Sequence, residues 1–198
     1  MVDVCLFNEL LTCDSTTGKE HRLADFLAER LLTRCNKLAR FDVKSMAEDA
    51  PDGYGTPQNL LFAWGVPKLI FCTHLDTVPP YIPPHFEASR VCGRGTCDAK
   101  GQILAMWEAC KALEDMGMTD FGLLLLAGEE TGSFGAKAFN SVISTSSSVI
   151  PTASAMFLCV KWAFSSRSLS ILSFLSIYRH LLTYILSNVG FIFLNFAT

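Results

Sequence analysis

The stretch Leu69-Ile-Phe-Cys-Thr-His-Leu-Asp-Thr-Val-Pro-Pro80 decides the fold. Its first part, residues 69–73, is apolar enough for a buried strand, and a polar turn carrying His74 and Asp76 follows directly. The two prolines end the strand, because proline has no amide hydrogen to donate to a neighbouring strand. Open α/β sheets bind ligands at the carboxyl ends of their strands, so we expect a functional site at His74 and Asp76.

Two later segments carry residues of the same chemical kind. Gly93-Arg-Gly-Thr-Cys-Asp-Ala-Lys-Gly101 places Asp98 at the predicted start of a helix that ends near Gly117. Ala127-Gly-Glu-Glu-Thr-Gly132 places Glu129 and Glu130 after an apolar run that predicts a central strand, covered on both faces. We therefore expect one imidazole and several carboxylates to meet at neighbouring strand ends.

The remaining pattern predicts a three-layer αβα sandwich, because strands and helices alternate along the chain. Strands at residues 59–64 and 68–73 flank the short turn Gly65-Val-Pro67, which predicts an antiparallel pair. Hydrophobic residues at helical spacing predict helices over residues 4–13, 19–36 and 133–140.

The acidic residues are unevenly distributed. The chain has 198 residues and a net charge of −3, yet residues 131–198 contain no Asp or Glu. We expect residues 1–143 to be the N-terminal part of an incomplete catalytic domain and residues 144–198 to be a divergent hydrophobic tail. Lys and Arg are too few and too scattered to indicate nucleic-acid binding.

The tail admits two interpretations. Its longest uncharged segment, residues 181–198, is slightly shorter than the roughly twenty apolar residues of a spanning helix. A membrane anchor is one interpretation, and a tail that does not belong to the fold is the other. Of these two interpretations, we expect the tail that does not belong to the fold rather than the membrane anchor.

The cysteines and the N-terminus indicate a cytoplasmic protein. The eight cysteines form no CxxC pair and lie in ordinary core-like sequence, which predicts free thiols in a reducing compartment. The first residues, Met-Val-Asp-Val-Cys, place an acid where a signal peptide has basic residues.

The candidate residues fit a metal-dependent hydrolase. Two zinc ions can polarise a carbonyl and activate water, and a free carboxylate can move the proton. His74 can bind a metal while Asp76 accepts its other ring hydrogen. Asp98 can bridge two metals, and adjacent Glu129 and Glu130 can divide the roles of base and ligand.

Each residue also has an ordinary explanation when it is taken alone. His74 can be a satisfied core histidine, Asp98 can cap a helix, and the two glutamates can form a solvated turn. The order and placement of all three segments favour the metal site. Three other histidines are not expected to be ligands, namely His21, His85 and His180.

The three segments resemble the N-terminal signatures of the M20 metallopeptidase and amidohydrolase family. The resemblance rests on Thr73-His-Leu-Asp-Thr-Val-Pro79, Gly93–Gly101 and Gly128-Glu-Glu-Thr-Gly-Ser-Phe-Gly-Ala-Lys137. The sequences of these segments are most similar to those of acetylornithine deacetylase and succinyl-diaminopimelate desuccinylase members. It implies a zinc-peptidase-like domain that hydrolyses the amide of N-acyl amino acids or dipeptides, within amino-acid metabolism.

The resemblance also implies roles for individual residues. His74 would bind the first metal, Asp98 would bridge, and Glu130 would bind the second metal. Glu129 would be the general base, and Asp76 would be the partner that orients His74. The metals would be two Zn²⁺ ions per site, with cobalt as the alternative.

The sequence departs from the family pattern after Glu130. The family has a further acidic ligand, a late histidine ligand and an inserted dimerisation domain, through which its members form homodimers. The acidic ligand is missing, because no Asp or Glu follows Glu130. The only later histidine, His180, is not expected to be a ligand, and the inserted domain is not found here. We expect impaired hydrolysis, and the alternative is an inactive fragment or pseudoenzyme that acts as an interaction or membrane-associated protein.

Overall fold

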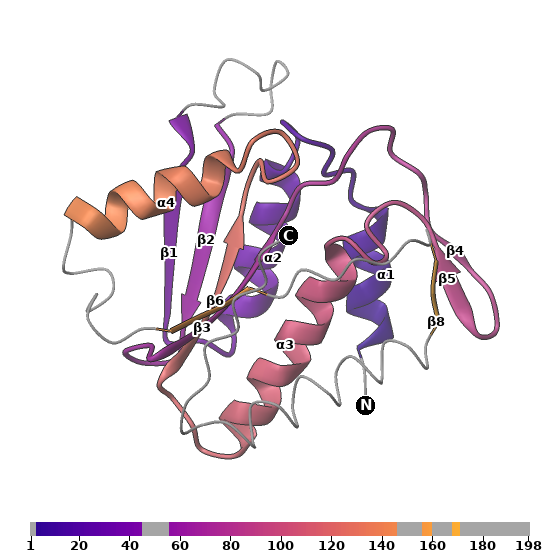
Figure 1. Cartoon of the computed structure of the whole chain (residues 1–198). Helices are drawn as coiled ribbons and strands as arrows, with labels where there is room; N and C mark the ends of the chain where they lie inside the picture. The colour runs from indigo at the N-terminus through magenta and orange to yellow at the C-terminus, as the bar shows by residue number, and fades with distance from the viewer. Residues whose placement is uncertain (1–2, 45–55, 146–155, 160–167, 171–198) are drawn as a thin grey trace.

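The computed structural model describes residues 3–44, 56–145, 156–159 and 168–170. Figure 1 shows a mixed sheet with helices packed against it, as the sequence predicts for an α/β fold. The elements follow in the order α1 (Val4–Thr12), α2 (His21–Leu32), β1 (Lys37–Asp42), β2 (Gln58–Ala63), β3 (Leu69–His74), β4 (His85–Phe86), β5 (Arg90–Cys92), α3 (Lys100–Asp115), β6 (Phe121–Leu126), α4 (Phe134–Thr145), β7 (Met156–Cys159) and β8 (Ser168–Ser170).

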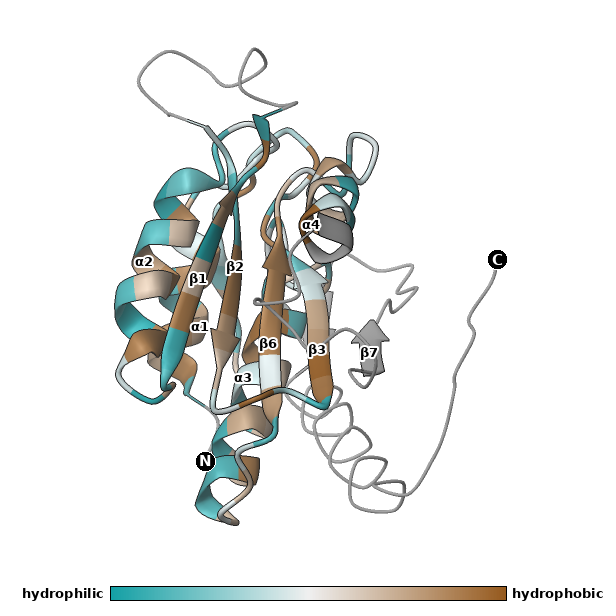
Figure 2. Cartoon of the chain, turned by 90° about the vertical axis from the view of Figure 1, so that its left-hand side faces the viewer, coloured by the Kyte–Doolittle hydropathy of each residue, from teal (hydrophilic) through white to brown (hydrophobic). Residues whose placement is uncertain are grey.

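The main sheet has the strand order β1-β2-β6-β3-β7. Strand β6 is parallel to β3 and antiparallel to β2, so the predicted direct pairing of β2 with β3 is wrong. All six residues of β6 are buried, and an apolar strand of this kind is most stable between two neighbours and under cover on both faces. Figure 2 shows the hydrophobic β6 lying between β2 and β3.

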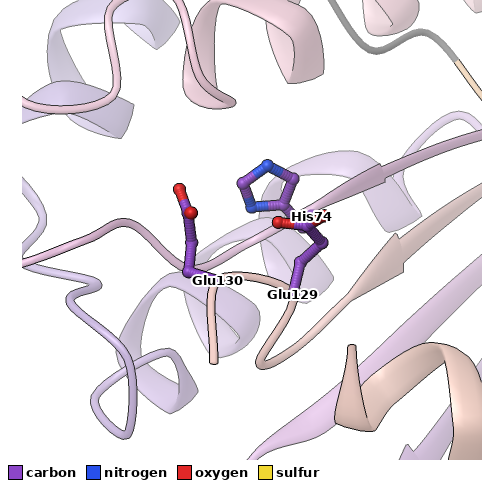
Figure 3. A group of neighbouring side chains, drawn as sticks. All are labelled: His74, Glu129 and Glu130. Atoms are coloured by element: carbon purple, nitrogen blue, oxygen red, sulfur yellow. The ribbon is translucent and has the colours of Figure 1, made fainter. Parts of the chain in front are cut away.

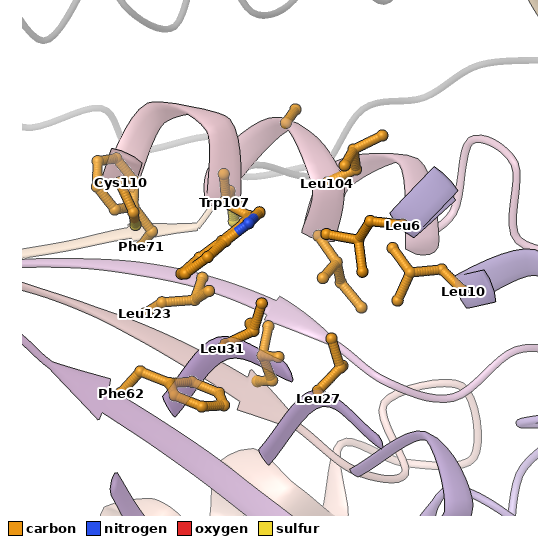
Figure 4. Close-up of a cluster of buried hydrophobic side chains, with 14 of the residues drawn as sticks. Leu6, Leu10, Leu27, Leu31, Phe62, Phe71, Leu104, Trp107, Cys110 and Leu123 are labelled. Carbon is orange, nitrogen blue, oxygen red and sulfur yellow. The ribbon is translucent and has the colours of Figure 1, made fainter. Parts of the chain in front are cut away.

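Successive residues of the strands face two separate hydrophobic clusters. Phe62 and Phe71 belong to the larger cluster, which α1, α2 and α3 cover (Figure 4). Leu61 and Ile70, one residue earlier on each strand, pack in a smaller cluster with Phe139 of α4. Helix α4 therefore packs on the face of the sheet opposite to α1, α2 and α3.

Several element boundaries differ from the sequence predictions. The helix predicted to start at Asp98 begins at Lys100, so Asp98 lies in the preceding turn. Helix α2 ends at Leu32 rather than Asn36, because Asn36 donates its side-chain amide to the Trp64 carbonyl oxygen and starts the approach to β1. His21, predicted to face solvent, is half-buried at the start of α2.

Two short strands lie within the range that we assigned to the tail. β7 pairs with β3 in parallel, and β8 pairs with β5 in a second small sheet. Residues 160–167 and 171–198, including the uncharged segment at 181–198, lie outside the described residues. The boundary at residue 143 therefore stays a prediction.

The described part of the chain gives two observations that bear on location. Seven cysteines are described with side chains, and all seven are free thiols. Within the same ranges, no helix combines the length and the apolar character needed to cross a membrane. The cytoplasmic location stays a prediction.

Candidate metal centre

Strand β3 ends at His74, whose ring is 7% exposed and is held from both nitrogens. Its Nδ1 lies 3.0 Å from the Asp76 carbonyl oxygen and 3.3 Å from Asp76 Oδ1. Its Nε2 lies 2.9 Å from Asp98 Oδ1. Because two acceptors face Nδ1, that nitrogen carries a hydrogen, and the Nε2 lone pair becomes available for a cation once the Nε2 hydrogen is lost.

The turn after β6 brings Glu129 and Glu130 to the same place. Its backbone is tied to Asp76, which is fully buried: the Glu129 amide donates to Oδ1 at 3.0 Å, and the Glu130 amide donates to Oδ2 at 3.1 Å. Gly128 opens the turn with φ of 62°, a left-handed conformation that glycine adopts without steric cost. One carboxylate therefore fixes the histidine and both glutamates relative to each other.

The candidate ligand atoms lie close together, and the group includes Glu129, which we predicted to be the base rather than a ligand. His74, Glu129 and Glu130 each offer a ligand atom, and these three atoms lie within 4.8 Å of one another. Figure 3 shows the imidazole and the two carboxylates projecting into the same region from the end of β3 and the turn after β6. Asp98 joins the group through its direct contact with His74. The individual roles of these residues stay predictions.

The charges of the group act on one another. Burial opposes protonation of His74, but the adjacent carboxylates of Asp76 and Asp98 outweigh it and raise the pKa of His74 to about 10. Burial raises the pKa of Glu130, with added repulsion from the Asp98, Asp76 and Glu129 carboxylates. Burial also works against ionised Asp76, yet the hydrogen bonds and charge of His74 lower its pKa. The carboxylates of the cluster thus favour a positive charge at His74.

Asp98 is supported by residues of β3 and α3 that the sequence did not single out. Thr73 donates its hydroxyl to Gln102 Oε1 at 2.9 Å. The Gln102 side-chain nitrogen donates to the Cys97 carbonyl oxygen at 3.2 Å and lies 3.4 Å from Asp98 Oδ1. A buried glutamine therefore links the end of β3 to the turn that carries Asp98.

Asn59 joins the two ends of the turn that carries Glu129 and Glu130, and the sequence did not single it out either. It is fully buried on β2, accepts the Ala127 amide hydrogen at 3.0 Å and donates to the Gly135 carbonyl oxygen at 2.8 Å. Gly135 must lack a side chain, because a Cβ there would overlap the Ala127 carbonyl oxygen and the Asn59 amide. Only the placement of a polar residue inside an apolar strand could have marked Asn59 in the sequence.

The donor set suits a divalent transition metal. Imidazole nitrogen and carboxylate oxygen are ligands for zinc and for cobalt, and the adjacent turn can accommodate positive charge among several carboxylates. His74, Asp98 and Glu130 are the residues that would hold the metal, with Asp76 orienting the imidazole. The residues present therefore fit a metal ion.

Comparison with known proteins agrees with this geometry. Residues 70–159 match the family model described as peptidase family M20/M25/M40. A protein of Aspergillus terreus described as a "probable carboxypeptidase" is 33% identical over 144 residues, which cover 67% of this chain and 32% of the relative. A peptidase M20 domain-containing protein of Schizosaccharomyces pombe is 30% identical over 68% of this chain and 33% of its own length. The chain thus spans about a third of these relatives.

Solved structures show the same fold. Aminopeptidase PepT of Bacillus cereus superposes with a TM-score of 0.52 at 28% identity, over 68% of this chain and 38% of its own. Human carnosine dipeptidase 1 superposes with a TM-score of 0.65 at 18% identity, over 82% of this chain and 39% of its own. The matched family model, the relatives and the shared fold show that this chain carries part of a peptidase domain of the M20 family, a family of metal-dependent hydrolases.

Proposed function

We propose that this chain is the N-terminal part of a metal-dependent hydrolase that cleaves the amide bond of a small substrate, either a dipeptide or an N-acyl amino acid. The observation that carries the proposal is the convergence of His74, Glu129 and Glu130 within 4.8 Å. The buried Asp76 beneath them supports it, because it orients the imidazole and holds the backbone of both glutamates.

The proposed roles follow from the environment of each side chain. His74, Asp98 and Glu130 would hold divalent metal, with Asp98 as the bridge between two Zn²⁺ or Co²⁺ ions. When bound, the metal supplies a Lewis acid that polarises the scissile carbonyl and lowers the pKa of water. Glu129 is half-buried beside the ligands and would take a proton from water and return it to the leaving nitrogen.

The substrate proposal has support from two sources. Curated relatives are described as "probable carboxypeptidases", which favours a peptide with a free carboxylate. Two segments resemble acetylornithine deacetylases in sequence, which favours an N-acyl amino acid. They are His-Leu-Asp-Thr-Val-Pro-Pro and Gly-Thr-Cys-Asp-Ala-Lys-Gly. Both substrates present an amide next to a carboxylate, and the experiment below separates them.

We further propose that the activity is impaired in the chain as it stands. A two-metal site needs an imidazole and a terminal carboxylate for each metal besides the bridge, and in the described residues His74, Glu129 and Glu130 come together while Asp98 contacts His74. No Asp or Glu follows Glu130 in the sequence. The proposal includes a cytoplasmic location and a three-layer αβα domain.

The test is hydrolysis by the full chain in the presence of Zn²⁺ or Co²⁺. N-acetylornithine and a set of dipeptides are incubated with wild type and Glu129→Gln, and the released primary amine is quantified. We expect slow, chelator-sensitive release that Glu129→Gln abolishes. Release of ornithine alone assigns the deacetylase, and release from dipeptides alone assigns the peptidase. Metal binding without any release assigns the pseudoenzyme alternative.

A further inference from the structure

The segment before α2 runs alongside the residues that follow β3. Thr16 and Thr77 form a parallel bridge, the Thr17 amide donates to the Thr77 carbonyl oxygen at 3.1 Å, and the Thr77 amide donates to the Ser15 carbonyl oxygen at 3.0 Å. The Thr17 hydroxyl also donates to Asp76 Oδ2 at 3.1 Å. The N-terminal segment is therefore fixed directly against the carboxylate that organises the metal centre.

This segment delivers Glu20 into the interior. Glu20 has no exposed surface, and its Oε1 accepts the Gly128 amide hydrogen at 3.3 Å. Its Oε2 is buried as well and has no hydrogen-bond partner in the part of the chain that the structure describes. A carboxyl group buried at this cost needs a reason beyond packing.

The Gly128 amide is the first of three consecutive amides that point at buried carboxyl groups. Asp76 accepts the next two, from Glu129 and Glu130. Glu20 and Asp76 therefore hold the whole backbone of the turn that presents the two glutamates. Because Gly128 has a left-handed φ and no side chain, its amide is the point at which the turn has most freedom to rotate.

We propose that Glu20 is a positioning residue of the metal centre, which holds the Gly128 amide so that Glu129 and Glu130 face His74. This inference rests on the proposed metal-dependent function for its consequence, but the contact itself is independent of metal. In this role Glu20 acts through the backbone of the turn, by way of the Gly128 amide. Burial, aided by the nearby Asp76 charge, raises the pKa of Glu20 to about 7, which agrees with a carboxyl group far from solvent.

The test uses the full chain with two variants of similar shape and one control. Glu20→Met keeps the length of the side chain and removes the acceptor, whereas Glu20→Gln keeps an acceptor oxygen. Glu29→Gln alters an exposed glutamate on α2, the helix that Glu20 directly precedes, and is the matched control. Amide hydrogen exchange at Gly128, Glu129 and Glu130 is followed by NMR without metal, and the Zn²⁺ dissociation constant is measured separately.

We expect Glu20→Met to accelerate exchange at Gly128 by at least about tenfold, with a smaller increase at Glu129 and Glu130 and none in β2 or β6. The same variant should weaken Zn²⁺ binding by about 10-fold to 100-fold, the range seen when residues behind metal ligands are changed. Glu20→Gln should restore both quantities to within about threefold of wild type, and Glu29→Gln should change neither.

Unchanged exchange at Gly128 in Glu20→Met would overturn the proposal. So would a uniform acceleration over the whole sheet, because Glu20 would then contribute only to global stability. If wild type bound no Zn²⁺, the proposed function would fail, and the exchange data would still decide whether Glu20 holds the turn.

Discussion

Two buried carboxyl groups under the same turn have opposite electrostatic environments. Burial works against ionised Asp76, but the hydrogen bond and charge of His74 and the amides of Glu129 and Glu130 lower its pKa, and Thr17 donates to it as well. Glu20 accepts the Gly128 amide hydrogen, and burial, aided by the nearby Asp76 charge, raises its pKa to about 7 against the backbone amides around it. Burial by itself therefore does not set the pKa of a carboxyl group: Asp76 has the imidazole of His74 beside it, whereas Glu20 has the carboxylate of Asp76 nearby.

The comparison separates two kinds of contribution to the site. Asp76 is ionised and joins three segments, so it stabilises the fold and the site together. Glu20 is held at an electrostatic cost and contributes to the geometry of one turn. Substitutions at these positions and at their neighbours test whether the division is correct.

The largest effect is expected at Asp76. Asp76→Ala leaves His74, Thr17 and the two turn amides without their acceptor, so the free energy of unfolding should fall by about 3–5 kcal/mol. Urea denaturation measures the change, and Asp76→Asn should lose clearly less because an acceptor oxygen remains. A loss of less than about 1 kcal/mol in Asp76→Ala would show that Asp76 does not join the three segments.

Glu20 should make the stability depend on pH. A carboxyl group with a raised pKa binds its proton more tightly in the folded chain, so stability falls as pH rises from its unfolded value of 4.5 towards about 7. The decline due to Glu20 should be on the order of 3 kcal/mol. Denaturation of Glu20→Gln at several pH values should show this decline removed. The same slope in both proteins would contradict the assignment.

Asn59 should contribute to stability through the base of the turn. Asn59→Leu leaves the Ala127 amide and the Gly135 carbonyl oxygen buried without partners, at a cost of about 2–3 kcal/mol. The adjacent Gln58→Leu is the control and should change stability by less than about 0.5 kcal/mol, because its side chain bonds only to exposed partners. An equal loss of unfolding free energy in the two variants would contradict the claim that the buried hydrogen bonds of Asn59 stabilise the turn.

The smallest effect on stability is expected at Glu130. Its carboxylate lies among others, so Glu130→Gln should stabilise the metal-free chain by less than about 1 kcal/mol. The same variant should weaken Zn²⁺ binding at least about tenfold, because it removes a ligand. Thermal unfolding with and without Zn²⁺ gives both values, and unchanged zinc affinity would exclude Glu130 from the metal centre.

The sequence singled out residues that the structure brings together, but not the residues that hold them in place. His74, Asp98, Glu129 and Glu130 follow strands or precede a helix, and α/β topology brings such positions together. The pairing of β2 with β3 was predicted wrongly, since a short turn favours a hairpin and only the later, fully apolar β6 reveals the intervening strand. Asn59 is marked only by being polar inside an apolar strand, and Glu20 has no local pattern that marks it as buried. Their partners lie 68 or more and 108 residues away.

The central claim is that His74 and the carboxylates around it bind a divalent metal. Equilibrium dialysis of the full chain against Zn²⁺, with His74→Ala and the exposed His85→Ala in parallel, tests it most directly. We predict that wild type and His85→Ala retain at least one ion and that His74→Ala retains none at the same free zinc concentration. Equal retention by His74→Ala and wild type, or no retention by wild type, would contradict the claim.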